Sequence, residues 1–316
     1  MAKHTATDLR QMQSLPLESK IVMTQQRIRQ WFDYWEGQVY LSFSGGKDST
    51  VLRDLIHNTP GVYDVPSVFC DTGLEYPEVR KFATELADVV IRPDVRFDEV
   101  IRKYGYPVVG KEVARTIHYA KKGSHWALMR LQGLDPQGHP SPWKERYIKW
   151  AFLKDAPFAV SDQCCDIMKK APFRKYETST GRKKFVGLMA AESQLRRTQW
   201  YKNGCNAFDG KKARSAPMSF WTEQDVLQYI KERSLPIPSV YGDVVLDGGD
   251  ATKLVTSGCS RTGCMFCMFG CHLDATPNRF QQMRESHPRQ YDYCMRPFEE
   301  KGLGLAEVLD FLGVER

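Results

Sequence analysis

The sequence predicts an α/β protein built on a parallel sheet that is flanked by helices. Short apolar strands alternate with amphipathic helices in the N-terminal part of the chain, a pattern typical of βαβ units. A glycine-rich turn, Ser44–Ser49, separates the first strand from the helix after it. The third observation is a set of cysteines toward the end of the chain, which predicts a cysteine-rich C-terminal region.

Each expected element follows from apolar spacing and from the residues that begin and end it. Leu17–Glu36 places apolar side chains near one helix face, and Thr222 is positioned to cap a helix with an apolar stripe. The expected helices are 17–36, 49–57, 78–87, 192–202, 222–233, 279–295 and 305–312, the expected strands are 39–43, 65–70, 89–91 and 185–189, and 247–271 is expected to be a glycine-rich loop.

Size and composition fit a globular enzyme of one large or two small domains, with 316 residues of which 42% are hydrophobic. No run of about 18 or more apolar residues predicts a membrane span. The polar Met1–Gln11 segment lacks the apolar core of a secretory signal, so we expect a cytoplasmic protein without a membrane partner. The net charge of +7 permits a partner that carries phosphates, either a nucleotide or a nucleic acid. Basic residues gather at 169–175, 182–184 and 196–197.

The turn Ser44-Gly45-Gly46-Lys47-Asp48-Ser49 is a predicted anion site. Glycines allow backbone N–H groups to turn toward an oxyanion, and the start of a helix adds partial positive charge. The Lys47 ammonium and two serine hydroxyls add further donors. The spacing differs from that of a Walker A loop. The alternative is a tight turn without a ligand.

These six residues resemble the PP-loop of the ATP pyrophosphatase superfamily. Its members cleave the α–β bond of ATP to adenylate a substrate, or bind a sulfonucleotide made in that way. Asp71-Thr72-Gly73 resembles the Asp-Thr-Gly segment of the phosphoadenosine-phosphosulfate (PAPS) reductase family. The resemblance implies that Asp71 lies near the nucleotide, with Mg²⁺ as a candidate bridge. The alternative for Asp71 is a turn residue that caps the next helix.

Two further segments extend the resemblance. Gly187–Ser193, followed by Arg196 and Arg197, is similar to the family's strand-to-helix segment that brings an arginine to the ligand. Phe220–Val226 is similar to its Trp-x3-Asp-Val helix, which we interpret as structural. The implied fold is adenine nucleotide alpha hydrolase-like. The implied catalytic residues are Lys47, Asp48 and Asp71, and the implied ligand-binding residues are Ser44, Gly45, Gly46, Lys47, Asp48, Ser49, Asp71, Arg196 and Arg197.

The expected organisation has three parts. Residues 1–37 form an N-terminal helical segment. Residues 38–240 form the nucleotide-binding α/β domain, with a helical insertion at about 104–157. Residues 241–316 hold the cysteine-rich loop and the last helices.

Several of the nine cysteines have metal-ligand spacing, since a Cys-x2-Cys turn brings two thiolates within reach of one metal. One candidate set is Cys164, Cys165, Cys264 and Cys267, which resembles the [4Fe–4S] ligands of the adenylyl-sulfate reductase branch. The rival is the local set Cys259, Cys264, Cys267 and Cys271, holding zinc or [4Fe–4S]. Sets with Cys205, His272 as a weaker ligand, and no metal at all remain open. We expect Cys70 to be a small buried apolar side chain.

One part of the family pattern is missing. Sulfonucleotide reductases of this family carry a nucleophilic cysteine in a C-terminal Glu-Cys-Gly-Leu-His-type segment, whereas Glu299–Leu305 contains no cysteine and none follows Cys294. ATP-using enzymes that thiolate tRNA or DNA combine a PP-loop with a cysteine-ligated cluster, and we expect that chemistry here.

The expected ligands and partners are ATP or an adenine sulfonucleotide, Mg²⁺, a [4Fe–4S] cluster, a nucleic-acid acceptor, and a sulfur-donor or reductant protein. The first alternative is a sulfonucleotide reductase that uses Cys294, Cys205 or Cys271 as its nucleophile. The second is a non-catalytic nucleotide-binding partner in a larger complex. Aromatic residues among the lysines of the middle insertion are candidates for base stacking, with packing as the alternative: Tyr119, Trp126, Trp143, Tyr147 and Trp150.

Overall fold

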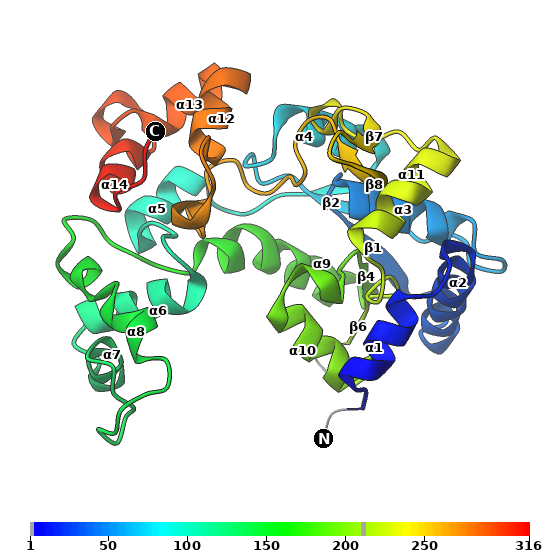
Figure 1. Ribbon diagram of the computed structural model, residues 1–316, viewed down its shortest axis with the longest axis horizontal. Helices are drawn as coiled ribbons and strands as arrows, with labels where there is room; N and C mark the ends of the chain where they lie inside the picture. The colour runs from blue at the N-terminus through cyan, green and yellow to red at the C-terminus, as the bar shows by residue number, and fades with distance from the viewer. Residues whose placement is uncertain (1–2, 210–212) are drawn as a thin grey trace. The chain divides into compact units, whose positions relative to one another are not determined.

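The structure is a computed structural model that describes residues 3–209 and 213–316. The chain forms two compact units (Figure 1). Unit 1 comprises Met1–Arg92 and Phe173–Gly263, and unit 2 comprises Pro93–Pro172 and Cys264–Arg316. The turn Ser44–Ser49, called the phosphate loop after the ligand expected for it, therefore belongs to unit 1, whereas the first candidate cysteine set belongs entirely to unit 2. The three-part division expected from the sequence stays a prediction.

Unit 1 contains a sheet that is parallel except at one edge, which confirms the α/β prediction. Its strands are β1 (Val39–Phe43), β2 (Ser67–Cys70), β3 (Val89–Ile91), β4 (Lys183–Val186), β5 (Asn206–Ala207) and β6 (Arg214–Ser215). Their order is β3-β2-β1-β4-β6-β5, and only β5 runs antiparallel, against β6. Leu41 of the inner strand β1 is aligned with Ser67 of β2 and Phe185 of β4. The carboxyl ends of five strands thus meet at one edge, where ligands of open α/β sheets bind.

Helices pack against this sheet through apolar stripes. Val51, Leu52 and Leu55 of α3 are buried, and α3 contacts β1, α2 and α11. The helices of this unit are α1 (Ala6–Gln13), α2 (Leu17–Tyr34), α3 (Lys47–His57), α4 (Pro77–Leu86), α10 (Gln194–Asn203) and α11 (Glu223–Arg233), with short 3₁₀ turns η3 (Ala190–Glu192) and η5 (Ser239–Tyr241). Helix α9 (Ala171–Thr180) begins at the boundary between the units.

The Trp221 segment has the structural role expected of it. Trp221 is fully buried and its indole N–H donates to Thr24 Oγ1 at 2.9 Å. Thr222 caps α11 in a capping box with Asp225. The Asp225 carboxylate also accepts from the buried Lys20 ammonium at 2.7 Å. These contacts fix α11 to α2.

Unit 2 is helical, in agreement with the expected insertion. Its first segment holds α5 (Phe97–Tyr104), α6 (Lys111–Lys121), α7 (His125–Leu131), α8 (Lys144–Ile148), η1 (Ala151–Asp155) and the π-helical turn η2 (Asp166–Lys170). Its second segment holds η6 (Cys271–Leu273), α12 (Arg279–Ser286), α13 (Pro288–Met295), η7 (Phe298–Glu300) and α14 (Leu305–Phe311). Within the described ranges, no helix is both long and apolar enough to cross a membrane.

Two sequence expectations are corrected. The expected loop at 247–271 begins inside an antiparallel hairpin formed by β7 (Val244–Asp247) and β8 (Asp250–Thr256). The hairpin is largely solvent-exposed, so it lacks the apolar pattern of a core strand, although Gly248-Gly249 is a typical hairpin turn. The single helix expected at 279–295 is two helices, because Pro288 has no N–H to continue α12 and instead begins α13.

Candidate functional site

Glycines shape the phosphate loop between β1 and α3. Gly45 has φ of +72°, and a Cβ there would lie 2.7 Å from Ala83 Cβ, so a larger residue does not fit. Gly46 is the N-cap of α3. After β4, a Cβ on Gly187 would lie only 3.2 Å from the Asp48 carbonyl carbon. The loop is therefore held closely between α4 and the segment that follows β4.

The hydroxyl groups of Ser44 and Ser49 lie within hydrogen-bonding distance of each other. Ser44 Oγ and Ser49 Oγ are 3.0 Å apart, and Gly46 N donates to Ser44 Oγ at 3.4 Å. Ser49 Oγ donates to the Gly46 carbonyl at 2.9 Å. Both hydroxyls thus lie at the start of α3, where an anion gains most from the helix dipole.

Lys47 is buried and already has partners. Its side chain is 4% exposed, and the ammonium donates to the Ser260 carbonyl at 2.9 Å. It also lies 3.2 Å from a Glu223 carboxylate oxygen and 5.6 Å from the centre of the Tyr241 ring. The Tyr241 hydroxyl lies 2.5 Å from Thr262 Oγ1 and accepts from Lys47 N at 3.4 Å. The segment Ser257–Gly263 therefore lies against the loop.

Sequence reasoning missed Lys47's neighbours Ser260, Glu223 and Tyr241, and it missed Thr262, which contacts the Tyr241 hydroxyl. From the sequence, Glu223 is expected only to begin the helix that Thr222 caps. Ser260 and Thr262 lie in a region expected to hold metal-binding cysteines. Nothing local in the sequence marks them, because their contacts with the loop depend on the fold.

Asp48 presents an unusual carboxylate. Burial raises its pKa, the Lys47 ammonium opposes that rise, and Glu223 adds to it. Among the described residues, its buried Oδ1 atom has no hydrogen-bond donor. The Lys47 ammonium lies 3.9 Å from this oxygen, which is an ion pair but too far for a hydrogen bond. A buried carboxylate oxygen without a hydrogen-bond donor is costly, so Asp48 is suited to bind a further cation such as Mg²⁺ at the loop.

Asp71 follows β2 and is held by two arginines of its own unit. Arg80 Nε and Nη2 donate to its two carboxylate oxygens at 2.7 and 2.8 Å. Arg92 Nε donates at 3.2 Å. The hydrogen bonds from Arg80 are the largest cause that lowers the pKa of Asp71, and the hydrogen bond from Arg92 lowers it further. The Asp71 carboxylate is therefore paired with protein cations, and its expected place near the nucleotide stays a prediction.

Arg196 lies within electrostatic reach of the loop. Ser193 caps α10 by accepting from Arg196 N, and the guanidinium pairs with Glu192. Burial lowers the pKa of Arg196, while the charge of Asp48 opposes that shift. Arg197 is the next residue of α10 and is exposed. The fold thus gathers Lys47, Asp48 and Arg196 at the carboxyl edge of the sheet.

The first candidate cysteine set lies together in unit 2. Cys164 Sγ donates to Cys165 Sγ at 4.0 Å. This bond and burial raise the pKa of Cys164, and the charges of Cys165, Cys267 and Cys264 raise it further. The same hydrogen bond is the main cause that lowers the pKa of Cys165. The positive charges of nearby lysines, Lys111 among them, lower it further. Four thiols that influence one another are a chemically suitable donor set for a thiolate-ligated cluster.

The rival cysteines have different surroundings. Cys271 is also in unit 2, and burial raises its pKa to about 11. Cys259 belongs to unit 1, where burial raises its pKa and Tyr76 lowers it. Cys205 is also in unit 1, and Cys70 is buried as expected. Across residues 3–209 and 213–316, no group of three or more Cys, His, Asp or Glu side chains is arranged to hold a metal ion.

The comparison with protein families decides the affiliation. The model of the phosphoadenosine phosphosulfate reductase domain matches residues 38–108 and 109–269. The chain belongs to this family. The match includes the phosphate loop, Asp71, the Arg196 segment and all four cysteines of the first set.

The chain is similar to two named proteins. A protein called sulfate adenylyltransferase subunit 2 1, from Shewanella sediminis strain HAW-EB3, is 24% identical over 248 residues, which are 76% of this chain and 69% of the relative. The crystal structure of phosphoadenylyl-sulfate (PAPS) reductase from Candida auris, a phosphate complex, aligns with a TM-score of 0.40 and 14% identity. That alignment covers 80% of this chain and 98% of the other.

The three alternative nucleophiles are poorly placed for thiolate chemistry in this PAPS reductase family member. Cys294 is fully buried, its Sγ donates to the Tyr291 carbonyl at 3.2 Å, and burial raises its pKa to about 12. Burial also raises the pKa values of Cys205 and Cys271. A thiol that resists ionisation is a weak nucleophile.

The expected stacking aromatics are divided between surface and interior. Tyr147 and Trp150 are buried, whereas Tyr119 and Trp143 are 43% and 66% exposed. The Arg130 guanidinium lies over the rings of both Trp126 and Tyr147, at 5.2 Å from each centre. Trp126 is half-buried, so Tyr119 and Trp143 are the most exposed of the five rings.

Proposed function

We propose that this chain binds ATP at Ser44–Ser49 and activates an acceptor by adenylation for sulfur transfer. The observation that carries the proposal is the combination at the loop of a buried lysine and a buried carboxylate oxygen without a donor, Lys47 and Asp48 Oδ1. Together they supply a cation for phosphate oxygens and a ligand for Mg²⁺. An adenine sulfonucleotide presents the same type of anion and is the alternative ligand.

The chemistry assigned to these residues is charge stabilisation. An acceptor oxygen attacks the α-phosphorus, the α–β bridging bond breaks, and pyrophosphate leaves with the electron pair. Lys47 leaves Ser260 and Glu223 to stabilise the negative charge that develops on the departing pyrophosphate. Asp48 would hold Mg²⁺, which would supply further positive charge to the phosphates, and Arg196 faces the remaining phosphate charge. A sulfur nucleophile then displaces AMP from the adenylated acceptor.

Asp71 receives a positioning role in this proposal rather than a metal-binding one. Its two carboxylate oxygens accept from Arg80 and Arg92, so the arginines that surround the end of β2 are held in place. We assign Mg²⁺ to Asp48 for this reason.

We further propose that Cys164, Cys165, Cys264 and Cys267 hold a [4Fe–4S] cluster. All four share unit 2 and influence one another's ionisation. Four cysteine thiolates are the usual ligands of a [4Fe–4S] cluster, and these four would hold it. Such a cluster would bind the sulfur to be transferred or would carry electrons. A nucleic-acid acceptor remains a prediction that rests on the exposed Tyr119 and Trp143 among basic residues.

A second candidate is a sulfonucleotide reductase, which the family membership favours. It requires a nucleophilic thiol, and burial raises the pKa values of the three candidates Cys205, Cys271 and Cys294. Family membership alone does not supply the missing nucleophile, so we rank this function below adenylation.

One experiment separates the candidates. The anaerobically purified chain is incubated with labelled ATP and Mg²⁺, then separately with a labelled adenine sulfonucleotide and a thiol reductant. Pyrophosphate release from ATP supports adenylation and excludes a non-catalytic nucleotide-binding role. Sulfite release from the sulfonucleotide, with no pyrophosphate from ATP, would overturn the proposal in favour of the reductase.

A further inference from the structure

The hairpin of β7 and β8 in unit 1 has two outer edges, and they differ in how their backbone groups are paired (Figure 1). On β8, Leu254 N donates to Gln224 Oε1 at 2.8 Å, and the Leu254 carbonyl accepts from Gln224 Nε2 at 2.9 Å. The Gln224 amide therefore pairs with this edge as the backbone of a neighbouring strand would. Helix α11, which carries Gln224, packs against β8.

The same contacts fix the direction of the backbone groups on β7. Leu246 is aligned with Leu254, whose N–H and carbonyl point away from β7. Because opposite residues of an antiparallel pair exchange both hydrogen bonds or neither, Leu246 also directs its N–H and carbonyl outward. Val244 does the same two residues earlier, while Asp243 accepts from Ser257 N inside the ladder at 2.9 Å. None of the hydrogen bonds among the described residues involves the outward groups of Val244 and Leu246.

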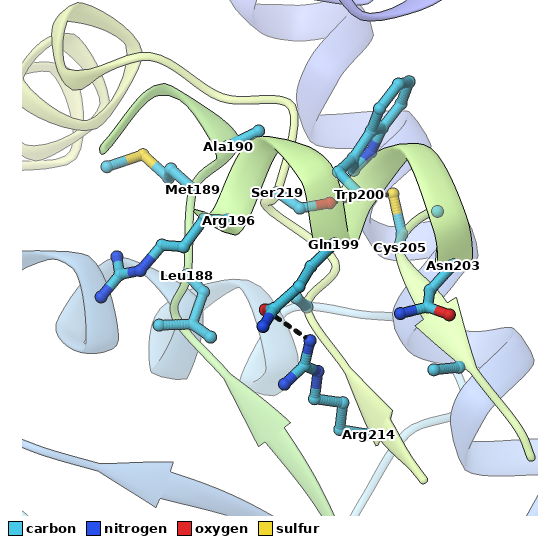
Figure 2. Close-up of a pocket in the computed structure, with 13 residues that line it drawn as sticks. Leu188, Met189, Ala190, Arg196, Gln199, Trp200, Asn203, Cys205, Arg214 and Ser219 are labelled. Carbon is cyan, nitrogen blue, oxygen red and sulfur yellow. Dashed lines mark hydrogen bonds between the residues drawn. The ribbon is translucent and has the colours of Figure 1, made fainter. Parts of the chain in front are cut away.

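The β7 edge is the least protected strand edge in the described part of unit 1. Natural sheets shorten or cover their edges, and the edge strands of the large sheet, β3 and β5, have three and two residues. Beside β5, Arg214 of β6 donates to Gln199 of α10 at 2.8 Å, and Figure 2 shows these side chains meeting. Strand β7 has four residues, of which Val245 and Leu246 are 38% and 53% exposed. An open edge with exposed apolar side chains accepts a further strand.

Charge on the hairpin determines which strand suits the open edge. Residues 243–256 contain three aspartates and one lysine, in a chain with a net charge of +7. Asp243 and Asp247 flank Val245 on one face, because side chains alternate along a strand. Lys253 lies 3.4 Å from Asp247, whereas Asp243 is exposed. The best-matched strand therefore has cationic residues at both ends and an apolar residue between them.

The same charges disfavour a second copy of β7. Two copies related by a two-fold axis would pair antiparallel, and in the register of greatest overlap Val245 meets its counterpart. Asp243 of one copy then lies opposite Asp247 of the other at both ends of the pair. Like charges directly opposite each other destabilise a sheet. The edge therefore suits a different protein better than a homodimer.

We propose that the β7 edge binds an extended segment of a partner protein that has apolar residues at its centre and lysine or arginine at both ends. The segment adds a strand whose backbone pairs with Val244 and Leu246. Strand β8 continues into Ser257–Gly263, where the Ser260 carbonyl accepts from the Lys47 ammonium at 2.9 Å. A partner on β7 is thus bound to the element that contacts the phosphate loop. Strand binding does not depend on which reaction the loop supports.

Fluorescence anisotropy with a short labelled peptide tests this edge on the full chain. The probe alternates valine and threonine with lysine at both ends, and its control has glutamate at both ends. Leu246→Pro removes the outward N–H but leaves the hydrogen bonds to β8, whereas Leu246→Ala keeps that N–H. Asp243→Asn removes the exposed charge. Asp64→Asn, an exposed aspartate elsewhere in unit 1, is the matched control.

We expect Leu246→Pro to weaken binding of the lysine-ended peptide about tenfold, and Leu246→Ala to weaken it less. Asp243→Asn should weaken it about two- to fivefold, Asp64→Asn should leave it unchanged, and the glutamate-ended peptide should bind more weakly than the lysine-ended one. Three results would each overturn the proposal: no binding at about 1 mM peptide, equal binding of the two peptides, or binding that Leu246→Pro leaves unchanged.

Two further measurements keep the test decisive. If thermal unfolding shows that Leu246→Pro does not fold, the lysine-ended peptide is N-methylated at every backbone amide and added to the wild type. Lost binding then supports strand addition, and undiminished binding rejects it. Sedimentation gives the oligomeric state: a wild-type dimer that Leu246→Pro separates into monomers would assign the edge to a second copy of this chain, against the proposal.

Discussion

The phosphate loop of unit 1 and the four cysteines of unit 2 differ in how their residues are brought together. The loop is contiguous from Ser44 to Ser49, and one strand and one helix position it. The cysteines come from two separate segments of the chain, at 164–165 and 264–267. The loop cation is neutralised by protein groups, whereas the cysteine thiols stand among lysines and one another. A contiguous site is thus readable from the sequence, and a discontinuous one requires the fold.

The largest expected effect is on the loop. We expect Lys47→Ala to lower the rate of pyrophosphate release from ATP by about 100- to 1,000-fold, because it removes a preorganised cation from the leaving group. Rates are measured with labelled ATP, and thermal unfolding verifies that the variant folds. Lys231→Ala on α11, an exposed lysine, is the matched control. A loss of less than about threefold in Lys47→Ala would show that the loop lysine is not the catalytic cation.

The second prediction concerns which cysteines hold the proposed cluster. We expect Cys264→Ser to lose most of the bound iron and of the absorbance near ~400 nm, since it removes a ligand of the first set. Cys259→Ser should keep both, because Cys259 belongs to unit 1. Iron content and absorbance are measured after anaerobic purification. Loss in both variants would favour the rival local set, and one zinc per chain without iron would contradict the cluster.

The third prediction concerns Asp71, whose pKa the Arg80 hydrogen bonds lower from the ordinary value of 3.8. A lowered folded-state pKa stabilises the fold above the unfolded-state value, and the stabilisation is lost as the pH falls through the folded-state pKa. We expect Asp71→Asn to cost about 1–2 kcal/mol near pH 7, less than a fully buried ion pair because both arginines are more than half exposed.

Denaturant unfolding at a series of pH values measures this effect. The difference between wild type and Asp71→Asn should shrink as the pH is lowered below 3.8. A difference that is constant across that range would mean that packing, not the carboxylate charge, stabilises the end of β2.

The smallest effect concerns the partner that neutralises the loop cation. Glu223 lies 3.2 Å from the Lys47 ammonium and its side chain is 40% exposed. Glu223→Gln should tighten ATP binding about two- to fivefold, because the nucleotide no longer competes with a carboxylate for the ammonium. Affinities are measured by calorimetry. Glu232→Gln, an exposed position on the same helix, is the control, and weaker ATP binding in Glu223→Gln would instead place this carboxylate in the binding site.

The secondary structure was largely predictable where local pattern and core burial agree. The strands Val39–Phe43 and Val89–Ile91 have the bounds that their apolar runs predict, and helix α3 differs only at its start. The β7–β8 hairpin was missed because it faces solvent and carries no core pattern. The helix break at Pro288 was a local signal that the apolar spacing on both sides obscured.

The sequence by itself determined the phosphate loop, the parallel strand–helix alternation and the family, because each depends on neighbouring residues and on backbone geometry that glycine and strand-to-helix turns impose. Only the tertiary structure decided that Asp71 is held by Arg80, that Lys47 contacts Ser260, and that Arg214 donates to Gln199. Those relationships join residues far apart in the chain. Charge and burial at a side chain depend on which segments the fold brings beside it, and no local pattern encodes that.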